Sequence, residues 1–308
     1  MLTCYESDLL VGVAPMYVSR QKNILGLGKQ LAFVGSGEPE ASETCAEYTD
    51  VLCAPQWQSK CMHGLIEALS LDWQISSVLL ARMLPDRAAA FRASLTGSMP
   101  YLRSHSAGYR YRLRIDDPSR PLGLSAKMRS SLRRKRRKIE ALSGVEIRWS
   151  VDEESALLNY EALAELHTRR WNSAGKPGAF ATPQFMDFHR ELVLESLPRN
   201  RLLLFSILER GSPLAVHYCL SEGDTAFFYQ SGIDLGRFAD LSAGNVCHLL
   251  AIEESMRRGL KYYDFMAGGE NSYKTRFTAR DDQPLVTTSY YRNGLSRYFL
   301  PVLKRIMS

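Results

Sequence analysis

One carboxylate of this sequence lies in an apolar segment, where it could take part in catalysis. Asp264 lies between Tyr263 and Phe265 in a short run that reads as a strand. A carboxylate there needs a partner or a raised pKa, which makes Asp264 a candidate general base. The alternative is a structural acid that pairs with Lys274 or Arg276. In either case Asp264 would mark a site, because the pair would line the same cleft.

Histidines provide two further candidates. His217, in the run Ala-Val-His-Tyr, shares one face of a predicted strand with Ala215 and Cys219. This placement fits either a catalytic histidine or a core histidine. His167 and Trp171 are four residues apart on one predicted helix face, so they either pack together or line an acceptor groove. No Ser/His/Asp set, metal constellation or nucleotide phosphate loop is discernible.

The cysteines and the hydropathy pattern restrict the class of protein. The six cysteines form no Cys-x-x-Cys pair and no Cys/His cluster, so we interpret them as reduced core residues of a cytoplasmic protein without metal. They are Cys4, Cys45, Cys53, Cys61, Cys219 and Cys247. The first residues, with Glu6 and Asp8, do not read as a signal peptide. No run approaches the roughly 18 apolar residues of a membrane-spanning helix.

The positive charge is concentrated in one segment. The net charge is +6, and residues 127–138 (KMRSSLRRKRRK) contain eight basic residues and no acidic one. Removing these eight from the 39 Lys and Arg residues leaves 31 against 33 acidic residues. Ser125 is predicted to cap a basic helix here, and Gly144 to follow its end. The helix is either a solvated linker or a platform for an anionic partner: a phosphate-bearing cofactor, an acidic carrier protein, tRNA or a membrane surface.

From residue 145 onward the pattern predicts the element order β-α-α-β-β-β-α-β-α-β. The strands are expected at 145–150, 201–209, 213–221, 225–231, 261–266 and 285–292, and the helices at 154–173, 183–197 and 244–258, with a short helix or loop at 273–279. Thr182 is expected to cap the second helix, with Pro183 at its first position. This is the order of the Gcn5-related N-acetyltransferase (GNAT) fold, a mixed sheet with helices on both faces.

The first 115 residues predict a shorter version of this order. Strands are expected at 2–5, 9–19, 31–34, 50–53, 76–83 and 109–115, and helices at 56–69 and 86–95. The opening strand and helix pair are missing, so this part is a reduced copy or begins inside a longer domain. We therefore predict an α/β fold of tandem GNAT-like acyltransferase domains: a reduced N-terminal domain (1–118), a basic linking helix (119–143) and a C-terminal acyltransferase domain (144–308).

Several segments of the C-terminal half resemble the CelD/BcsL-type (cellulose-biosynthesis) acetyltransferase family. That family is a branch of the group that contains the FemAB peptidoglycan-bridge aminoacyltransferases. The resemblance rests on residues 213–234 with a Tyr-Gln-Ser-Gly run, and on 241–277 with Tyr-Asp-Phe and Tyr-Lys-x-Arg-Phe. The runs SLRRKRRKIEAL and LHTRRW also fit. The resemblance covers about 115–290 and implies acyl transfer to an amine or hydroxyl.

Acyl transfer from a thioester needs a cradle for the donor's phosphates, hydrogen-bond donors for the oxyanion and a base. The predicted helix that opens with Ser242, Ala243, Gly244 and Asn245 suits the phosphates, since free N–H groups at a helix N-terminus point at an anion. The Gln/Arg-x-x-Gly-x-Gly/Ala signature of ordinary acetyltransferases is absent there, so a plain capped helix is the alternative. The expected donor is acetyl-CoA or another acyl-CoA, or an acyl-carrier protein.

The strands on either side of this helix splay apart in the GNAT fold and hold the donor between them. Tyr229, Gln230 and Ser231 are then placed to face the reacting centre, opposite Asp264. The predicted catalytic residues are Asp264, Tyr229 and His217. The predicted substrate-binding residues are Gln230, Glu270, Lys274, Arg276 and Trp171, with Lys274 and Arg276 as anion binders and Glu270 in a Gly-Gly-Glu-Asn loop that would recognise an acceptor amine.

Three functions follow from the resemblance together with these patterns. The first is an acyltransferase that moves an acyl group, in the first place acetyl, to a cell-envelope polysaccharide or peptide precursor, in the cytoplasm or at the inner face of the membrane. The second is a FemAB-like transferase that uses aminoacyl-tRNA; the basic helix favours it and the lack of a long coiled-coil insertion disfavours it. The third is a non-catalytic accessory subunit of polysaccharide biosynthesis. Peripheral membrane contact would use the basic helix or a predicted terminal helix at 295–307.

Overall fold

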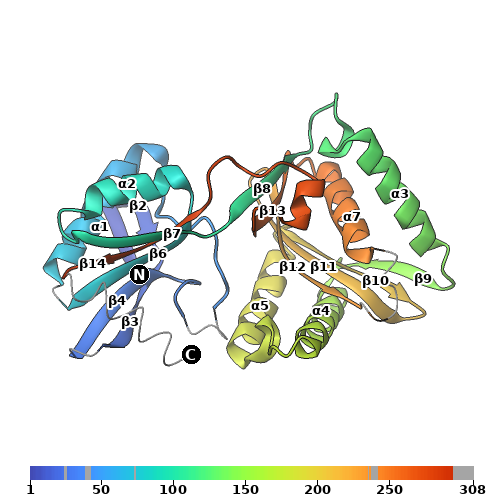
Figure 1. Ribbon diagram of the computed structural model, residues 1–308, viewed down its shortest axis with the longest axis horizontal. Coiled ribbons are helices and arrows are strands. Elements are labelled where there is room, and N and C mark those ends of the chain that lie inside the picture. Colours follow the sequence, from blue (N-terminus) through green and yellow to red (C-terminus); the bar gives the residue numbers. More distant parts are fainter. Residues whose placement is uncertain (24–25, 39–42, 73, 235, 237–241, 294–308) are drawn as a thin grey trace. The chain divides into compact units, whose positions relative to one another are not determined.

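The chain folds into two compact units (Figure 1). The computed structural model describes residues 1–23, 26–38, 43–72, 74–234, 236 and 242–293. The first unit combines Met1–Tyr109 with the segment from Asp282 onward, and the second is Arg110–Asp281. Both units contain β-sheets with helices packed on them, which confirms the predicted mixed α/β class.

The first unit has a three-stranded sheet of order β1-β2-β5 and a five-stranded sheet of order β3-β4-β6-β14-β7. The strands are β1 Leu2–Glu6, β2 Leu9–Ala14, β3 Met16–Asn23, β4 Gly26–Phe33, β5 Leu52–Cys53, β6 Ile75–Met83, β7 Tyr101–Ser106 and β14 Val286–Tyr291, and the helices are α1 Gln58–Leu71 and α2 Pro85–Leu95. Their apolar faces meet in one core around Phe33, Leu69, Leu80 and Phe91, each at most 1% exposed.

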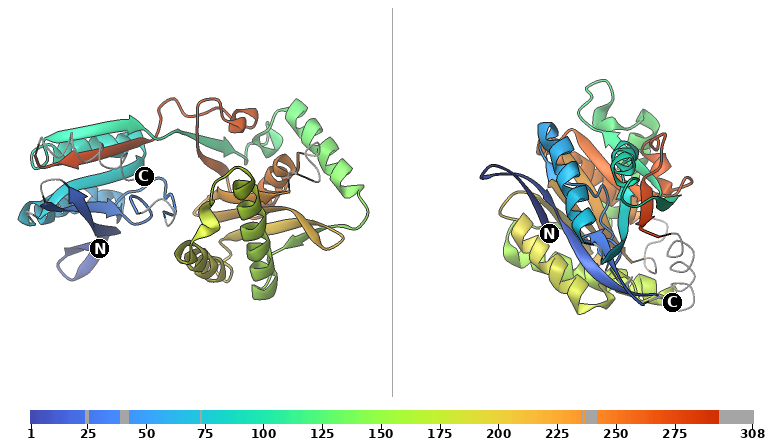
Figure 2. Two further views of the ribbon diagram at one scale, coloured as in Figure 1. Left: turned by 60° about the horizontal axis from the view of Figure 1, so that its bottom comes forward. Right: turned by 90° about the vertical axis from the view of Figure 1, so that its left-hand side faces the viewer.

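The second unit is built on one six-stranded sheet of order β8-β13-β12-β11-β10-β9. The strands are β8 Tyr109–Arg114, β9 Val145–Trp149, β10 Leu202–Glu209, β11 Ser212–Glu222, β12 Thr225–Ile233 and β13 Tyr262–Gly268, and the helices are α3 Ala126–Glu140, α4 Glu153–Ser173, α5 Pro183–Ser196, α7 Ala243–Arg257 and the short 3-10 helix η5 Tyr273–Arg276. Helices α4 and α5 cover one face of the sheet and α7 covers the other (Figures 1 and 2).

The helices begin where the sequence places their caps. Ser125 Oγ accepts the N–H of Met128 at 3.2 Å, and Thr182 Oγ1 accepts the N–H of Phe185 at 3.4 Å. Both contacts satisfy N–H groups that a helix cannot pair internally. The caps predicted at Ser125 and Thr182 are therefore confirmed, and they fix the positions at which the basic helix α3 and helix α5 start.

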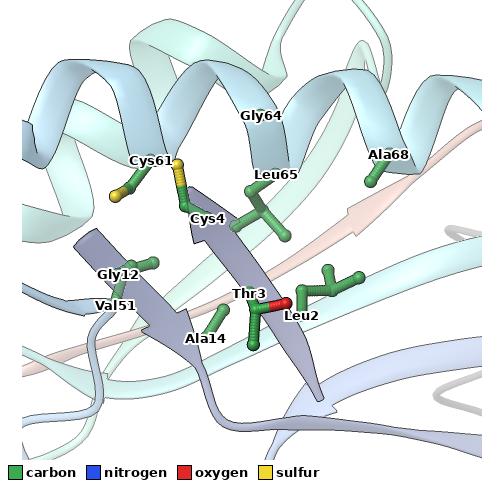
Figure 3. Close-up of a pocket in the computed structure, with 10 residues that line it drawn as sticks. All are labelled: Leu2, Thr3, Cys4, Gly12, Ala14, Val51, Cys61, Gly64, Leu65 and Ala68. Atoms are coloured by element: carbon green, nitrogen blue, oxygen red, sulfur yellow. The ribbon is translucent and has the colours of Figure 1, made fainter. Parts of the chain in front are cut away.

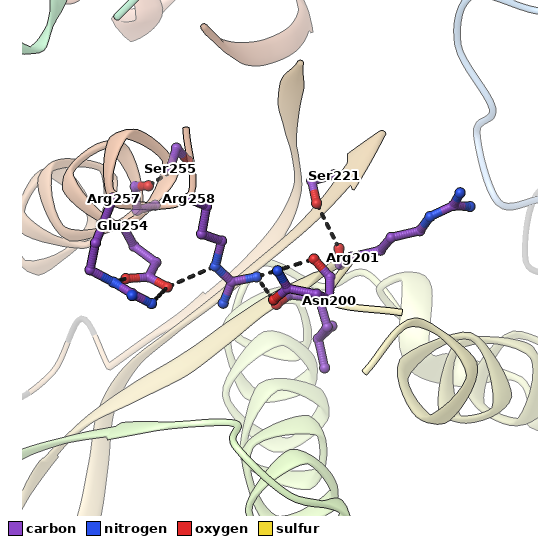
Figure 4. A network of polar contacts seen from close by, with 9 residues as sticks. Asn200, Arg201, Ser221, Glu254, Ser255, Arg257 and Arg258 are labelled. Carbon is purple, nitrogen blue, oxygen red and sulfur yellow. Dashed lines mark hydrogen bonds and ion pairs between the residues drawn. The ribbon is translucent and has the colours of Figure 1, made fainter. Parts of the chain in front are cut away.

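A polar cluster anchors the C-terminal end of α7 to the sheet (Figure 4). Glu254 binds the guanidinium groups of Arg257 and Arg258 at 2.7 Å. Arg258 also donates to the carbonyl oxygen of Leu202 at 2.9 Å, at the first residue of β10. Cations at a helix C-terminus are favoured by the helix dipole. These contacts hold the C-terminal end of α7 against the start of β10.

Two strands belong to a different sheet from the one that the sequence predicts. β8, predicted to close the N-terminal domain, lies beside β13 in the second unit. β14, predicted as the last strand of the C-terminal domain, pairs with both β6 and β7 in the first. Both segments are strands as predicted, but the predicted sheet of each is wrong, because an apolar pattern identifies a strand and not its partner. The predicted domain boundaries after residue 118 and before residue 144 stay predictions.

Smaller differences concern the first unit. The predicted strand at 9–19 is interrupted at Pro15, which separates β2 from β3, because proline has no N–H for a ladder. β4 is longer than predicted, and β7 was not predicted. The predicted helix at 295–307 lies outside the described residues. Among the residues that are described, no helix has the length and hydropathy to cross a membrane.

Candidate active site

Strands β12 and β13 separate in the middle of the second unit's sheet. Their parallel ladder contains only the pairs Thr225↔Tyr262, Ala226↔Tyr263 and Phe227↔Asp264. Beyond these pairs, β12 continues to Ile233 and β13 to Gly268. The gap therefore opens directly after Asp264, at the place where the GNAT element order predicts it.

A β-bulge lies on β12 where the two strands part. In the ladder with β11, Tyr218 faces Gln230 and Cys219 faces Phe228, so Tyr229 is the extra residue. Bulges disrupt the regular ladder and occur preferentially beside active sites. The hydroxyl group of the half-buried Tyr229 lies 2.9 Å from Nε2 of His189 on α5. Burial lowers the pKa of His189 to about 4, so this imidazole is neutral at pH 7.

The N-terminus of α7 carries a lysine from the basic helix. Ser242 has φ 52° and ψ 45°, and its side chain does not cap α7. Instead its Oγ accepts a hydrogen bond from Nζ of Lys135 at 3.0 Å. The N–H groups of the first helical residues, Ala243 and Gly244, precede the first helical hydrogen bonds. An ammonium group and a helix N-terminus thus lie together at the predicted phosphate cradle, with Asn245 in the same first turn.

Most of the remaining basic residues of α3 are exposed. Leu132 and Ile139 are buried, and Arg136 bridges to Glu253 of α7 at 2.9 Å. The exposed basic residues are Lys127, Arg133, Arg134, Arg137 and Lys138. None of these five forms an ion pair with another residue that the structure describes. We call these five residues the basic face of α3.

Asp264 and Lys274 both bind backbone groups at the end of β13. Asp264 is 1% exposed, and its Oδ1 accepts the N–H of Met266 at 2.7 Å. Met266 has φ +62°, a left-handed conformation that is strained for a residue with a side chain. Nζ of Lys274 donates to the carbonyl oxygens of Met266 and Ala267 at 3.2 and 2.5 Å. Both side chains therefore stabilise this turn, whereas Arg276 is exposed.

His217 belongs to a buried polar network that the sequence did not reveal. Its Nε2 lies 2.8 Å from the hydroxyl of Tyr263, which also lies 2.9 Å from Nδ1 of His248. Nε2 of His248 in turn lies 3.1 Å from the hydroxyl of Tyr273. Burial lowers the pKa of His217 to about 3 and holds that of His248 well below its usual range. The sequence signal was a histidine inside the apolar run of α7, Val-Cys-His-Leu-Leu.

Three other predicted substrate-binding residues each contact a different partner. Gln230 Oε1 accepts the N–H of Ser231 at 3.1 Å. Glu270 forms an exposed ion pair with Arg280 at 2.8 Å. Trp171 donates its indole N–H to Nε2 of His167 at 2.8 Å, so these two residues pack together. Their roles in binding remain predictions.

A pocket of about 370 Å³ opens between the end of α4 and the end of β12. Its lining residues are Arg169, Arg170, Ser173, Ile233, Asp234 and Gly236. Arg169 binds Asp234 across it at 2.9 Å. Ile233 also contacts the first turn of α7, since a Cβ added to Gly244 would lie 2.7 Å from its Cδ1. The pocket therefore adjoins the predicted phosphate cradle.

The first unit contains a smaller pocket of a different character (Figure 3). It measures about 100 Å³ and lies between α1 and strands β1 and β2. Its lining is apolar except for Thr3 and the thiols of Cys4 and Cys61. Burial raises the pKa of Cys61 to about 12, so its thiol is not activated. All six cysteines are free, and the described residues contain no cluster of three or more His, Cys, Asp or Glu fit for a metal.

The comparisons with known proteins support the GNAT interpretation. Residues 126–275 match the family model described as "Acetyltransferase (GNAT) domain". No curated protein matches the sequence. The matched residues lie within the second unit, Arg110–Asp281.

Solved structures with a similar fold cover almost the whole chain. One is the C-terminal domain of a putative lysylphosphatidylglycerol synthetase from Agrobacterium fabrum: TM-score 0.58, 10% identity, 94% of this chain and 86% of that chain. FemX has a TM-score of 0.58 at 10% identity, with 96% and 88% covered. L-PGS from Bacillus licheniformis has a TM-score of 0.57 at 10% identity, with 94% and 83% covered. At these identities the likeness concerns the fold, and the predicted tandem GNAT-like fold class is confirmed.

Proposed function

We propose that the second unit transfers an acyl group from a thioester donor to an amine or hydroxyl. The observation that carries this proposal is the gap between β12 and β13 beside the α7 N-terminus, where Lys135 supplies a positive charge. An anionic group binds favourably at such a helix end, and a neighbouring ammonium group strengthens that binding. The donor would be acetyl-CoA, another acyl-CoA or an acyl-carrier protein.

The donor's phosphates would bind at Ala243, Gly244 and Lys135, and its thioester arm would extend between the parted strands. A backbone N–H group at the Tyr229 bulge would then meet the thioester oxygen, which gains negative charge during attack. The acceptor's nitrogen or oxygen attacks the thioester carbon, the new C–N or C–O bond forms, and the C–S bond breaks.

The acceptor must also lose a proton. Of the three predicted catalytic residues, only Tyr229 is half-buried, whereas Asp264 and His217 are each 1% exposed. We therefore assign proton removal to a water molecule held by Tyr229. Asp264 would act through the turn at Met266, and His217 through Tyr263. The resemblance to CelD/BcsL-type proteins supports a polysaccharide or peptide precursor of the cell envelope as acceptor.

A second candidate donor is aminoacyl-tRNA. The five cations of the basic face of α3 favour it, because each phosphate neutralised by Lys or Arg contributes to nucleic-acid affinity. The fold similarity to FemX and to lysylphosphatidylglycerol synthetase also supports an aminoacyl donor. If tRNA binds there, replacing Arg133, Arg134 and Arg137 with Gln lowers the salt dependence of binding by about 2–3 in log–log slope. An unchanged slope would contradict contact with this face.

Thioester cleavage in the presence of amino-sugar and peptide acceptors tests the first candidate. The released thiol is measured for the wild type, Lys135→Ala and the control Lys138→Ala, which removes an exposed lysine from the same helix. A charge-assisted hydrogen bond contributes about 1.5–3 kcal/mol, so Lys135→Ala should raise KM for the donor by about 10- to 100-fold. Lys138→Ala should leave it unchanged. No cleavage by a folded protein, with any acceptor or with aminoacyl-tRNA, would favour the accessory-subunit alternative.

A further inference from the structure

Four hydrogen-bonded side chains connect the core of the second unit to its surface. They run in the order His217, Tyr263, His248, Tyr273, with contacts of 2.8, 2.9 and 3.1 Å. The first three are at most 3% exposed, and Tyr273 is 41% exposed. Only Tyr273 can therefore meet a substrate, and the other three side chains stand behind it.

The number of N–H and O–H groups requires the hydrogen bonds among these four side chains to point in one direction. A neutral imidazole has one N–H and a phenol has one O–H. Tyr263 lies between two imidazole nitrogens, so it donates to one and accepts from the other. Donation to Cys219 instead is the weaker choice, because that sulfur is 3.7 Å away and thiols are poor acceptors. Thus either His217 donates to Tyr263 and His248 to Tyr273, or every bond points the other way.

The buried end of the chain decides between these directions. Nδ1 of His217 is buried and has no hydrogen-bond partner among the described residues. If the bonds pointed toward the core, this nitrogen would carry the hydrogen, which would leave a donor unpaired in the core. Buried unpaired N–H groups are rarer than buried acceptors that lack a partner. The hydrogen of His217 therefore lies on Nε2, and every bond in the chain points outward.

We propose that His217, Tyr263 and His248 are positioning residues that make Tyr273 a hydrogen-bond donor toward the acyl-transfer site. His248 donates its Nε2–H to the Tyr273 oxygen, so the phenolic hydrogen is not used on the core side. This inference rests on the proposed function, because it assigns Tyr273 the developing negative charge of that reaction. When the C–S bond breaks, the thiolate takes the phenolic proton. The exposed Tyr273 then regains a proton from solvent.

The surroundings of Tyr273 fit this role. Burial raises its pKa to about 12, so the phenol is protonated at neutral pH, and the charge of Arg170 opposes part of that rise. Arg170 also lines the 370 Å³ pocket, so its charge acts both on this pocket and on Tyr273. Among the described residues, the polar and charged groups that face His248 are His217 on β11, Tyr263 on β13, and Tyr273 and Lys274 on η5. Burial, His217 and Lys274 together keep His248 neutral.

Histidine NMR tests the direction of the chain without any substrate. In protein labelled with 15N and 13C histidine, His217 and His248 should both carry their hydrogen on Nε2 from about pH 6 to 8. His217→Gln and His248→Gln assign the signals. A hydrogen on Nδ1 of His248 would overturn the proposal, whatever the enzyme does. If the tautomers agree but no thioester is cleaved, the proposed function fails and the hydrogen-bond direction stands.

Kinetics test the catalytic consequence. General acid catalysis contributes about 10²- to 10⁴-fold, so Tyr273→Phe should lower kcat by at least the smaller of these factors, with little change in KM for the donor. His248→Leu should lower kcat less, and His248→Gln, which keeps an N–H donor, should restore much of that loss. Equal kcat for His248→Leu and His248→Gln would contradict a positioning role, as would an active Tyr273→Phe variant.

Discussion

Tyr218 and Tyr263 are both fully buried in the second unit, but only one of their hydroxyl groups is paired. The hydroxyl of Tyr263 contacts His217, His248 and Cys219, whereas that of Tyr218 has no partner among the described residues. A buried polar group costs free energy unless it is hydrogen-bonded. The two tyrosines therefore contribute to stability in opposite ways.

Tyr263→Phe should destabilise the protein and Tyr218→Phe should not. Removing the Tyr263 hydroxyl leaves two buried imidazole nitrogens unpaired, at a cost of about 1–3 kcal/mol in the free energy of unfolding. Removing the Tyr218 hydroxyl leaves nothing unpaired and should be neutral or slightly stabilising. Urea denaturation measures both changes. Equal effects of the two substitutions would contradict the hydrogen-bond assignment.

Buried histidines make stability depend on pH. The pKa values of His167, His189 and His217 are lowered to about 4, 4 and 3. The unfolded chain, with a histidine pKa near 6.5, binds these protons first as the pH falls. Stability is therefore complete above about pH 6.5 and is lost toward pH 4, by up to about 1.4 kcal/mol per pH unit for each histidine.

Replacing His189 with Gln isolates one such contribution. The slope of unfolding free energy against pH between about 4.5 and 6 should fall by one proton, or about 1.4 kcal/mol per pH unit. Above pH 7 the slopes of wild type and variant should coincide, which serves as the internal control. A slope that is unchanged at low pH would show that His189 is already protonated in the folded protein.

At the scale of elements, close approach of α4 to β12 depends on Gly232. A Cβ at this position would lie 2.7 Å from Cβ of Leu166 and 3.1 Å from the carbonyl oxygen of Leu163. At Gly244, by contrast, an added Cβ would meet only Ile233 among the described residues, with the side-chain end Cδ1 nearest at 2.7 Å. A flexible side-chain end can move, whereas helix backbone cannot.

Gly232→Ala should therefore cost about 1–3 kcal/mol of unfolding free energy, the usual cost of overpacking a core. Gly244→Ala, in the first turn of α7, is the matched substitution and should be close to neutral, since Ala also favours the helix. Thermal or urea unfolding distinguishes them. A Gly232→Ala variant as stable as wild type would mean that α4 can shift away from the sheet.

Local elements were predictable where local chemistry determines them. The caps at Ser125 and Thr182, and the limits of α4, α7 and β12, follow from periodicity and turn residues. The bulge at Tyr229 was not predictable, because it arises from pairing with β11. For the same reason Asp264 and His217 could be singled out as unusual, while His248 and Tyr273 could not. Their importance depends on contacts between distant segments.

At the scale of the whole molecule, β8 and β14 each belong to the sheet of the other unit from the one that the sequence predicts. β14 lies between β6 and β7, with Tyr290 facing Val78 on one side and Leu102 on the other. The sequence correctly marks both segments as strands. It does not contain a local signal for which sheet each strand joins, since long-range pairing is set by the completed core.

A chain that ends at Asp281 should lose the first unit's sheet but keep the second. Without β14, both β6 and β7 lose a hydrogen-bonded neighbour. Hydrogen exchange should therefore become fast in peptides from β6 and β7, while those from β11 and β12 stay protected. Continued protection of β6 and β7 would show that this sheet forms without β14.

Calorimetric titration with acetyl-CoA, a long-chain acyl-CoA and CoA tests the central claim most directly. The claim is that a phosphate-bearing thioester binds at the N-terminus of α7. The account predicts saturable binding that Gly244→Glu abolishes and Lys135→Ala weakens by about 10- to 100-fold, with Lys138→Ala indistinguishable from wild type. Absence of binding to all three ligands, or equal effects of the two lysine substitutions, would contradict it.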